Sequence, residues 1–189
     1  MSEKKEYTII MTGNAASKTA LNILKSKREM LSERYSADYL ERAEKELEKS
    51  ISDGAILNEL LSDLKERTAD TLIKAFVMCG KDGVFEALWR LGEETESGLK
   101  AELFSIPILQ CAIEFCDLID INPYEADSTG CTLIAAVSPW EVLCETEAAG
   151  LPAYIIGHTT GENARVVVGS TTRYLTGQTK NENKSSSDN

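Results

Sequence analysis

The sequence predicts an α+β protein, a layered α/β sandwich built on a mixed, largely antiparallel sheet. Short apolar runs rich in Val, Ile and Thr alternate with segments of helical spacing, so strands and helices are expected to share one core. The last two strand-like runs, 165–168 and 171–175, are separated by Gly169 and Ser170, which is typical of a hairpin turn. Parallel strands need a longer crossover connection, so the hairpin argues against a purely parallel, doubly wound sheet.

The first third of the chain predicts one strand followed by helices. Residues 7–12 are largely apolar and end at Gly13, which indicates a strand followed by a turn. Apolar residues return with helical spacing from Ala15 onward. Ser36 is predicted to be the N-cap of a helix that carries a polar and an apolar side. A further helix is predicted from a second apolar stripe, consisting of Ile56, Leu57, Leu60, Leu61 and Leu64.

Shorter elements are expected after residue 70. Strands are predicted at 71–78, 99–103, 131–137, 153–159, 165–168 and 171–175. Because the run 131–137 is apolar throughout, it is expected to be covered on both faces. Helices are predicted over 84–91, over 107–116 and from Pro139 to a stop at Gly150. The first should end near Gly92, the second should have Pro107 in its first turn, and Ser138 and Glu141 should form a capping box on the third.

Composition limits the classes of function. The 189 residues carry 31 acidic and 20 basic side chains, for a net charge of −11. Phosphate backbones are bound by clustered Lys and Arg, so the sequence predicts no nucleic-acid partner. No apolar run approaches the roughly 18 residues of a membrane span, and the charged start lacks the apolar core of a signal peptide. We therefore expect no membrane association and a cytoplasmic location, with one domain over 1–176 and a disordered polar tail over 177–189.

Acidic residues are concentrated in one part of the chain. Between Glu93 and Glu147 there are twelve acidic residues and a single basic one, Lys100. A solvated acidic surface explains this segment, and a basic partner or bound cations are the alternative.

The cysteines and the histidine give little support for catalysis. An odd number of cysteines, five, without a signal peptide predicts reduced thiols, and no pair has the CxxC spacing of a zinc site. Most of them lie in apolar runs, so they are expected to be small buried hydrophobic residues. The one histidine, His158, is expected at the surface rather than as a base. The sequence thus predicts no catalytic and no metal-binding residue.

Five segments in a fixed order resemble a known family. They are 83–89 (GVFEALW), 106–108 (IPI), 116–124 (CDLIDINPY), 128–137 (STGCTLIAAV) and 149–162 (AGLPAYIIGHTTGE). Together they resemble the C-terminal domain of the aminoimidazole ribonucleotide (AIR) synthetase-related superfamily, and most of all its hydrogenase maturation factor-like members. Residues 9–12 are similar to the first strand of that domain. The resemblance implies an AIR synthase C-terminal-domain-like fold, standing without the N-terminal domain that supplies most ATP and metal contacts.

The resemblance also implies a set of ligand-binding positions. These are Gly80, Asp82, Gly83, Asn122, Ser128, Thr129 and Gly130. Family members usually carry an Asp-x-Thr-x-Gly-Gly turn before the helix at 84, where backbone N–H groups approach a phosphate. Here Met78 replaces the acid, Gly80 replaces the Thr, and Asp82 replaces the first Gly of the pair. The Gly-rich turn after the first strand is similarly eroded over residues 12–17. Turn geometry alone also explains the glycines and the polar residues of the set.

Two functions follow as expectations. The first is a binding or assembly module that is non-catalytic by itself and needs no cofactor. The alternative is the C-terminal half of an ATP-dependent synthetase or kinase, completed by a separate N-terminal-domain chain, in which case ATP and Mg²⁺ are expected. Because the domain would lack its usual neighbour, apolar surface should be uncovered. We therefore expect a homodimer or a higher symmetric oligomer, with the acidic segment outside the contact.

Overall fold

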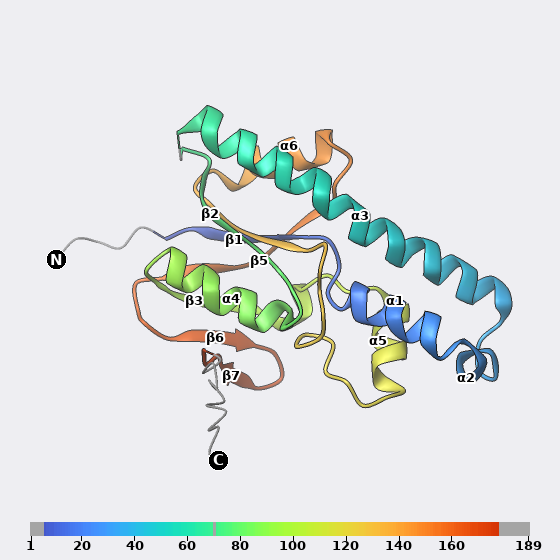
Figure 1. The fold of residues 1–189 in the computed structure, drawn as a ribbon. Helices are drawn as coiled ribbons and strands as arrows, with labels where there is room; N and C mark the ends of the chain where they lie inside the picture. Colours follow the sequence, from blue (N-terminus) through green and yellow to red (C-terminus); the bar gives the residue numbers. More distant parts are fainter. Residues whose placement is uncertain (1–5, 70, 178–189) are drawn as a thin grey trace, which may run out of the picture.

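A computed structural model of the chain describes residues 6–69 and 71–177. Its centre is a seven-stranded sheet with the order β2-β4-β1-β5-β3-β6-β7 (Figure 1). The strands are β1 (Thr8–Thr12), β2 (Ile73–Met78), β3 (Gly98–Glu102), β4 (Thr132–Ala136), β5 (Ala153–Thr160), β6 (Arg165–Val168) and β7 (Thr172–Tyr174). Only β3 and β6 pair in parallel, and every other neighbouring pair in this sheet is antiparallel. The predicted α+β class and the mixed, largely antiparallel sheet are therefore confirmed.

Helices cover the two faces of the sheet in different ways. They are α1 (Ser17–Ser26), α2 (Arg28–Ser32), α3 (Ala37–Thr68), α4 (Gly83–Glu94), α5 (Gln110–Asp117) and α6 (Pro139–Ala148), with a short 3₁₀ turn η1 (Leu103–Ser105). Helix α4 packs on one face, and the second half of α3 packs with α6 on the other (Figure 1). Helices α1 and α5 and the first half of α3 form a separate apolar cluster beyond one end of the strands.

The covering of the sheet is uneven. All five residues of β4 are buried, as the apolar run predicted, because helices lie on both of its faces. On the α4 side, buried residues continue across the sheet to Leu99 of β3 and Val167 of β6. The cluster under α3 and α6 contains no residue of β3, β6 or β7. The face of these strands that points away from α4 is therefore not covered by this layer.

Helix α3 corrects the prediction of two helices in this region. It runs without interruption for 32 residues through Gly54. A Cβ atom on Gly54 would lie 2.5 Å from the Cα atom of Gly130, so this glycine permits a close approach between α3 and the loop before β4. The second predicted apolar stripe is also partly wrong, because Ile56 points outward and is 56% exposed, whereas Leu57, Leu61 and Leu64 are buried.

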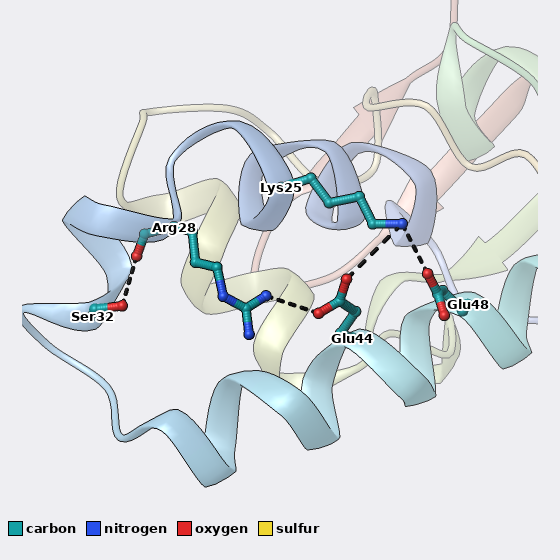
Figure 2. A network of polar contacts seen from close by, with 5 residues as sticks. All are labelled: Lys25, Arg28, Ser32, Glu44 and Glu48. Carbon is teal, nitrogen blue, oxygen red and sulfur yellow. Dashed lines mark hydrogen bonds and ion pairs between the residues drawn. The ribbon is translucent and has the colours of Figure 1, made fainter.

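Ion pairs fasten α1 and α2 to the first half of α3 (Figure 2). Lys25 Nζ lies 2.8 Å from Glu48 Oε1 and 4.0 Å from Glu44 Oε1, and Arg28 Nη1 lies 2.8 Å from Glu44 Oε2. The hydroxyl of Ser32 donates a hydrogen bond to the Arg28 carbonyl at 2.8 Å. The charged side chains are partly exposed, so water screens each pair and its contribution to stability is small. The network explains these charges as contacts between helices rather than as a binding site.

The predicted helix ends have mixed outcomes. The Ser36 hydroxyl accepts a hydrogen bond from the Tyr39 amide at 3.3 Å, so this N-cap is confirmed. The capping box at Ser138 is wrong, because its side chain makes no cap hydrogen bond, although Pro139 does occupy the first turn. Gly150 follows α6 with φ +74°, as expected of a helix stop.

Two further helix ends are shifted from their predicted positions. Helix α5 begins at Gln110 instead of at Pro107. Helix α4 continues through Gly92, where a Cβ atom would collide with the Arg165 side chain. Gly92 thus provides room for a neighbour rather than ending the helix. Of the predicted tail 177–189, all but Gly177 lies outside the described residues.

Candidate functional site

The family-matched positions lie on two loops that meet at the start of α4. The first loop is the turn between β2 and α4, and the second connects α5 with β4. The Gly80 carbonyl accepts hydrogen bonds from the Ser128 amide at 3.0 Å and from the Gly83 amide at 3.2 Å. The structure therefore brings the Gly80–Gly83 turn against the loop that carries Asn122, Ser128, Thr129 and Gly130.

The chain itself occupies the N-terminus of α4. The amides of Val84 and Phe85 both donate to the Tyr124 carbonyl, at 2.9 and 3.2 Å. These are the N–H groups that a helix N-terminus would offer to an anion. Gly83 has φ +77°, and a Cβ atom there would lie 2.5 Å from the Tyr124 oxygen, so only a glycine permits this approach. The loop after α5 thus caps α4 at the place where the family pattern implies a phosphate.

Carboxylates surround the outer side of this turn. A cavity of about 330 Å³ is lined by residues of α4, of the loop after α5 and of β7, including Asp82, Glu86 and Glu125. Its cationic side chain is Arg173, which forms an ion pair with Glu125 and lies 4.8 Å from the centre of the Phe85 ring. Phe85 in turn stacks on Tyr124, with ring centres 5.5 Å apart. Glu86 is paired with Arg90, and Glu125 with Arg173, so the charge of Asp82 remains and makes the cavity unfavourable for a phosphate group.

The remaining family-matched residues are engaged in turn contacts. The Ser128 hydroxyl accepts from the Ala16 amide and donates to the Ala126 carbonyl, both at 2.9 Å. The Asn122 side chain accepts from the Tyr124 amide at 3.1 Å. The Thr129 amide and hydroxyl both donate to Asp127 Oδ1, at 3.0 and 2.6 Å. The bond from Ala16 joins this loop to the start of α1, and the other bonds fit the turn interpretation of the residues.

The eroded turn after β1 is filled as well. Both the amide and the side chain of Asn14 donate to the Ser50 hydroxyl of α3, at 3.2 and 3.3 Å. The Ser17 hydroxyl donates to the Asn14 carbonyl at 2.8 Å. Only about 30 Å³ is left beside Gly13 and Gly130, which is room for about one water molecule. Helix α3 therefore occupies the space next to this turn.

Neither cysteine at the site, Cys79 or Cys131, is activated as a nucleophile. Cys79 follows β2 directly, and its amide donates to the Cys131 carbonyl at 2.9 Å. Burial raises the pKa of the Cys79 thiol to about 12 and also raises the pKa of Cys131. Both thiols therefore stay protonated at neutral pH, and a thiol is a poor nucleophile and metal ligand. Met78 stands where the family pattern implies an acid, and a Met side chain is a poor ligand for a hard cation.

The burial of four cysteines and the exposure of His158 agree with the sequence prediction. All five cysteines are free, and only Cys144 is exposed. His158 lies exposed on β5. Within residues 6–69 and 71–177, no group of three or more His, Cys, Asp or Glu side chains is placed to hold a metal ion. In the same residues, no helix has the length and apolar character needed to cross a bilayer.

Sequence reasoning missed the residues that fill the site. The Tyr124 carbonyl, Glu125 and Arg173 are all absent from the predicted set, although Tyr124 belongs to a family-matched segment. A backbone carbonyl carries no sequence signal. Arg173 is 48 residues from its partner Glu125, on the strand at the sheet edge. Only the fold places these two side chains together.

Solved structures of known proteins have a fold similar to that of this chain. No family model matches the sequence, and no curated protein sequence matches it. Among solved structures, the chain is similar to E. coli HypE, a hydrogenase maturation protein, with a TM-score of 0.67 and 15% identity over 93% of this chain and 50% of that chain. It is also similar to a chain of a HypE–HypF complex, with a TM-score of 0.58 and 15% identity over 94% of this chain and 54% of that one.

The chain is also similar in fold to a kinase. Thiamine-monophosphate kinase from Stenotrophomonas maltophilia K279a matches with a TM-score of 0.53 and 14% identity, over 86% of this chain and 54% of that chain. The chain spans about half the length of these solved proteins. Identities this low establish a shared fold and not a shared activity. The chain thus has the AIR synthase-like fold that it shares with HypE and thiamine-monophosphate kinase, and it spans about half the length of those proteins.

Proposed function

We propose that this chain is a binding or assembly module that is non-catalytic by itself and needs no cofactor. The observation that supports this most is the capping of α4, because the Val84 and Phe85 amides are already bonded to the Tyr124 carbonyl. A phosphate would have to displace this loop and would then meet Asp82, Glu86 and Glu125. The solved HypE–HypF complex gives a precedent for this fold in a protein that assembles with a partner.

The test is nucleotide binding by the purified chain. A ligand at 100 times its Kd stabilises a protein by about 2.7 kcal/mol, which raises the Tm of a chain of this size by roughly 5–10 °C. We expect ATP with Mg²⁺ to leave the Tm unchanged within about 1 °C and to be hydrolysed no faster than in buffer. A clear, saturable rise in Tm would contradict the proposal.

The second candidate is the C-terminal half of an ATP-dependent enzyme that a separate chain completes. The observation in its favour is that the chain matches only about half the length of HypE and of the kinase. In that case the isolated chain would also fail to bind ATP, so the first test does not separate the two candidates. The two candidates are separated by mixing the chain with a separately produced N-terminal domain from a hydrogenase maturation factor-like protein. ATP hydrolysis by the mixture and by neither chain alone would favour the second candidate.

A further inference from the structure

Two hollows flank α6, on the sheet face opposite α4. One of about 630 Å³ lies between α6 and the start of β5, and the other, of about 390 Å³, lies on the other side of the helix, beside Leu72. Trp140 lines both hollows and is 72% exposed, although Val142 on the inner side of the same helix is fully buried. We call this region the α6 surface; it comprises Trp140, Leu143, Cys144, Leu151, Pro152 and Tyr154.

The α6 surface has the shape of a docking site. Trp140, Leu143, Cys144 and Glu147 follow one another at helical spacing, so they form one stripe along α6. The larger hollow is lined mainly by apolar groups, with Leu151 and Pro152 opposite the helix. An exposed Trp beside apolar hollows is typical of a surface that another molecule covers, because interface anchors are enriched in Trp and fill such pockets.

The edge of this surface is acidic. Glu141 and Glu145 line the smaller hollow, and Glu147 lines the larger one. Glu145 Oε2 lies 3.6 Å from Arg67 Nη2 of α3. Among the described residues, neither Glu141 nor Glu147 forms an ion pair. Apolar hollows bordered by unpaired carboxylates are complementary to a partner that carries apolar and cationic side chains together.

A second copy of this chain fits the surface poorly. In a two-fold contact the same patch meets itself, so three carboxylates of one copy would face three of the other. The basic side chain that contacts this edge, Arg67, is already engaged with Glu145. Like charges brought together at an interface weaken it, so the edge of the α6 surface favours a different molecule.

We propose that the α6 surface docks a basic amphipathic helix of a partner protein. Its apolar side chains would fill the hollows on both sides of Trp140, and its Lys or Arg residues would meet Glu141 and Glu147. A helix suits the site because its ridges can pack along the Trp140–Leu143–Glu147 stripe. The proposal names the partner class for the assembly role and rests on that proposed function, but it uses a surface separate from the α4 turn.

Cys144 provides a reporter within the surface. It is the one exposed cysteine, and the other four are buried. Burial raises the pKa of Cys79 to about 12 and the pKa of Cys111 and of Cys116 to about 11. An aromatic disulfide reagent should therefore modify one thiol per native chain rapidly and all five only after unfolding. A molecule docked on the α6 surface should slow the modification of Cys144.

The probe is a blocked peptide of about 18 residues, or about five helical turns, with Leu on one face and Lys on the other. Its control has the same Leu positions and Glu in place of every Lys. We expect the Lys peptide to bind saturably and to slow the modification of Cys144 by about tenfold or more at saturation. The Glu peptide should do neither.

Matched variants locate the binding. Trp140→Ala should weaken binding of the Lys peptide by about tenfold or more, whereas Phe104→Ala, which removes an aromatic ring that is 79% exposed elsewhere, should change it less than about twofold. The double variant Glu141→Gln/Glu147→Gln should weaken binding by about three- to tenfold and reduce its salt dependence. The control Glu59→Gln/Glu162→Gln removes two exposed carboxylates elsewhere and should have little effect. All four variants alter exposed side chains, and their Tm values verify the fold.

Three results would overturn the proposal. The first is that the Lys peptide does not bind. The second is that it binds without protecting Cys144, and that its affinity falls as much in the control variants as in the variants of the α6 surface. Protection of Cys144 that rises with protein concentration alone would assign the surface to a second copy. Nucleotide binding is measured separately by the ATP test, so a failed docking experiment leaves the non-catalytic assignment standing, and a positive ATP test leaves the docking result to be judged by itself.

Discussion

Single residues decide whether the α4 turn is open or closed. Gly83 has a positive φ and no space for a Cβ atom, and this allows the Tyr124 carbonyl to bond the first amides of α4. Gly80, three residues earlier, has open space around it and no positive φ. The two glycines belong to the same family-matched turn, yet only Gly83 is required by the backbone.

This difference predicts unequal effects of substitution. Gly83→Ala should lower the free energy of unfolding by about 2 kcal/mol or more, because the left-handed backbone costs about 1–2 kcal/mol and the added Cβ atom collides with Tyr124. Gly80→Ala should leave it unchanged or raise it by about 0.4–1 kcal/mol, since it restricts the unfolded chain. Urea denaturation of both variants measures the difference. An equal loss of unfolding free energy in both variants would show that the approach to Tyr124 does not require a glycine at position 83.

At the scale of elements, helix ends that look alike in the sequence differ in the structure. Ser36 and Ser138 both precede helices and are both predicted caps, but only Ser36 accepts a hydrogen bond from its helix. Ser36→Ala should therefore cost about 1 kcal/mol of stability. Ser138→Ala should cost less than about 0.5 kcal/mol. Thermal or urea unfolding of the pair checks this, and a cost at Ser138 equal to that at Ser36 would contradict the assignment of the caps.

Helices α3 and α5 are joined by a contact that depends on pH. Tyr39 Oη donates to Glu114 Oε2 at 2.7 Å, and Gln110 Nε2 donates to Oε1 at 2.9 Å. Burial opposes the charged carboxylate, but these hydrogen bonds outweigh it and lower the pKa of Glu114 below its usual value of 4.5. A lowered folded-state pKa gives stability above the unfolded-state pKa that is lost as the pH falls through the folded-state value.

Replacing Glu114 should therefore change the pH dependence of stability. Between about pH 5 and pH 3, the wild-type chain should lose stability more steeply than Glu114→Gln, because only the wild type takes up a proton at this position. Glu59→Gln, which alters an exposed carboxylate outside the contact, serves as the control. Urea denaturation at several pH values gives the slopes. A Glu114→Gln slope as steep as that of the wild type would show that the contact does not favour the charged carboxylate.

On the scale of the whole molecule, one half of the sheet is covered on a single side. Four residues are in register across this half of the sheet: His158 of β5, Lys100 of β3, Val166 of β6 and Tyr174 of β7. They lie on the face that the α3 and α6 layer does not reach. Tyr174 is 70% exposed, and Ile155 on β5 is 42% exposed. This face holds fewer carboxylates than α6, so it is the more suitable surface for contact between identical chains.

We propose that the chain self-associates through this face. The contact would include Lys100 of β3 and therefore part of the segment 93–147, which the sequence predicts to lie outside it. Light scattering at micromolar concentration should give about twice the chain mass of 20.7 kDa or a higher multiple. Val166→Lys should shift the mass toward the monomer, because it puts a charge in the middle of the contact, and Ile56→Ser, at an exposed site on α3, should not. A monomeric mass of the wild type that stays unchanged from low to high salt would contradict this prediction.

The sequence by itself determined most elements and the class of fold. The alternation of short apolar runs with helical stripes predicted all seven strands, and continuous apolarity predicted the burial of β4. These features follow from local periodicity, which one stretch of chain displays without its neighbours. The ordered family-like segments predicted the AIR synthase-related fold, which the similarity to HypE confirms.

Tertiary structure alone decided how the candidate site is filled. Gly54 lies just before the second predicted helical stripe, and in the fold it is the point where α3 approaches Gly130. The loop at Tyr124 caps α4 from 40 residues away, and Arg173 reaches Glu125 from the last strand. Such contacts join distant segments through backbone atoms and shared space, and neither leaves a periodic trace in the sequence. The sequence could therefore place the turn, but only the packed chain shows that its own loop closes it.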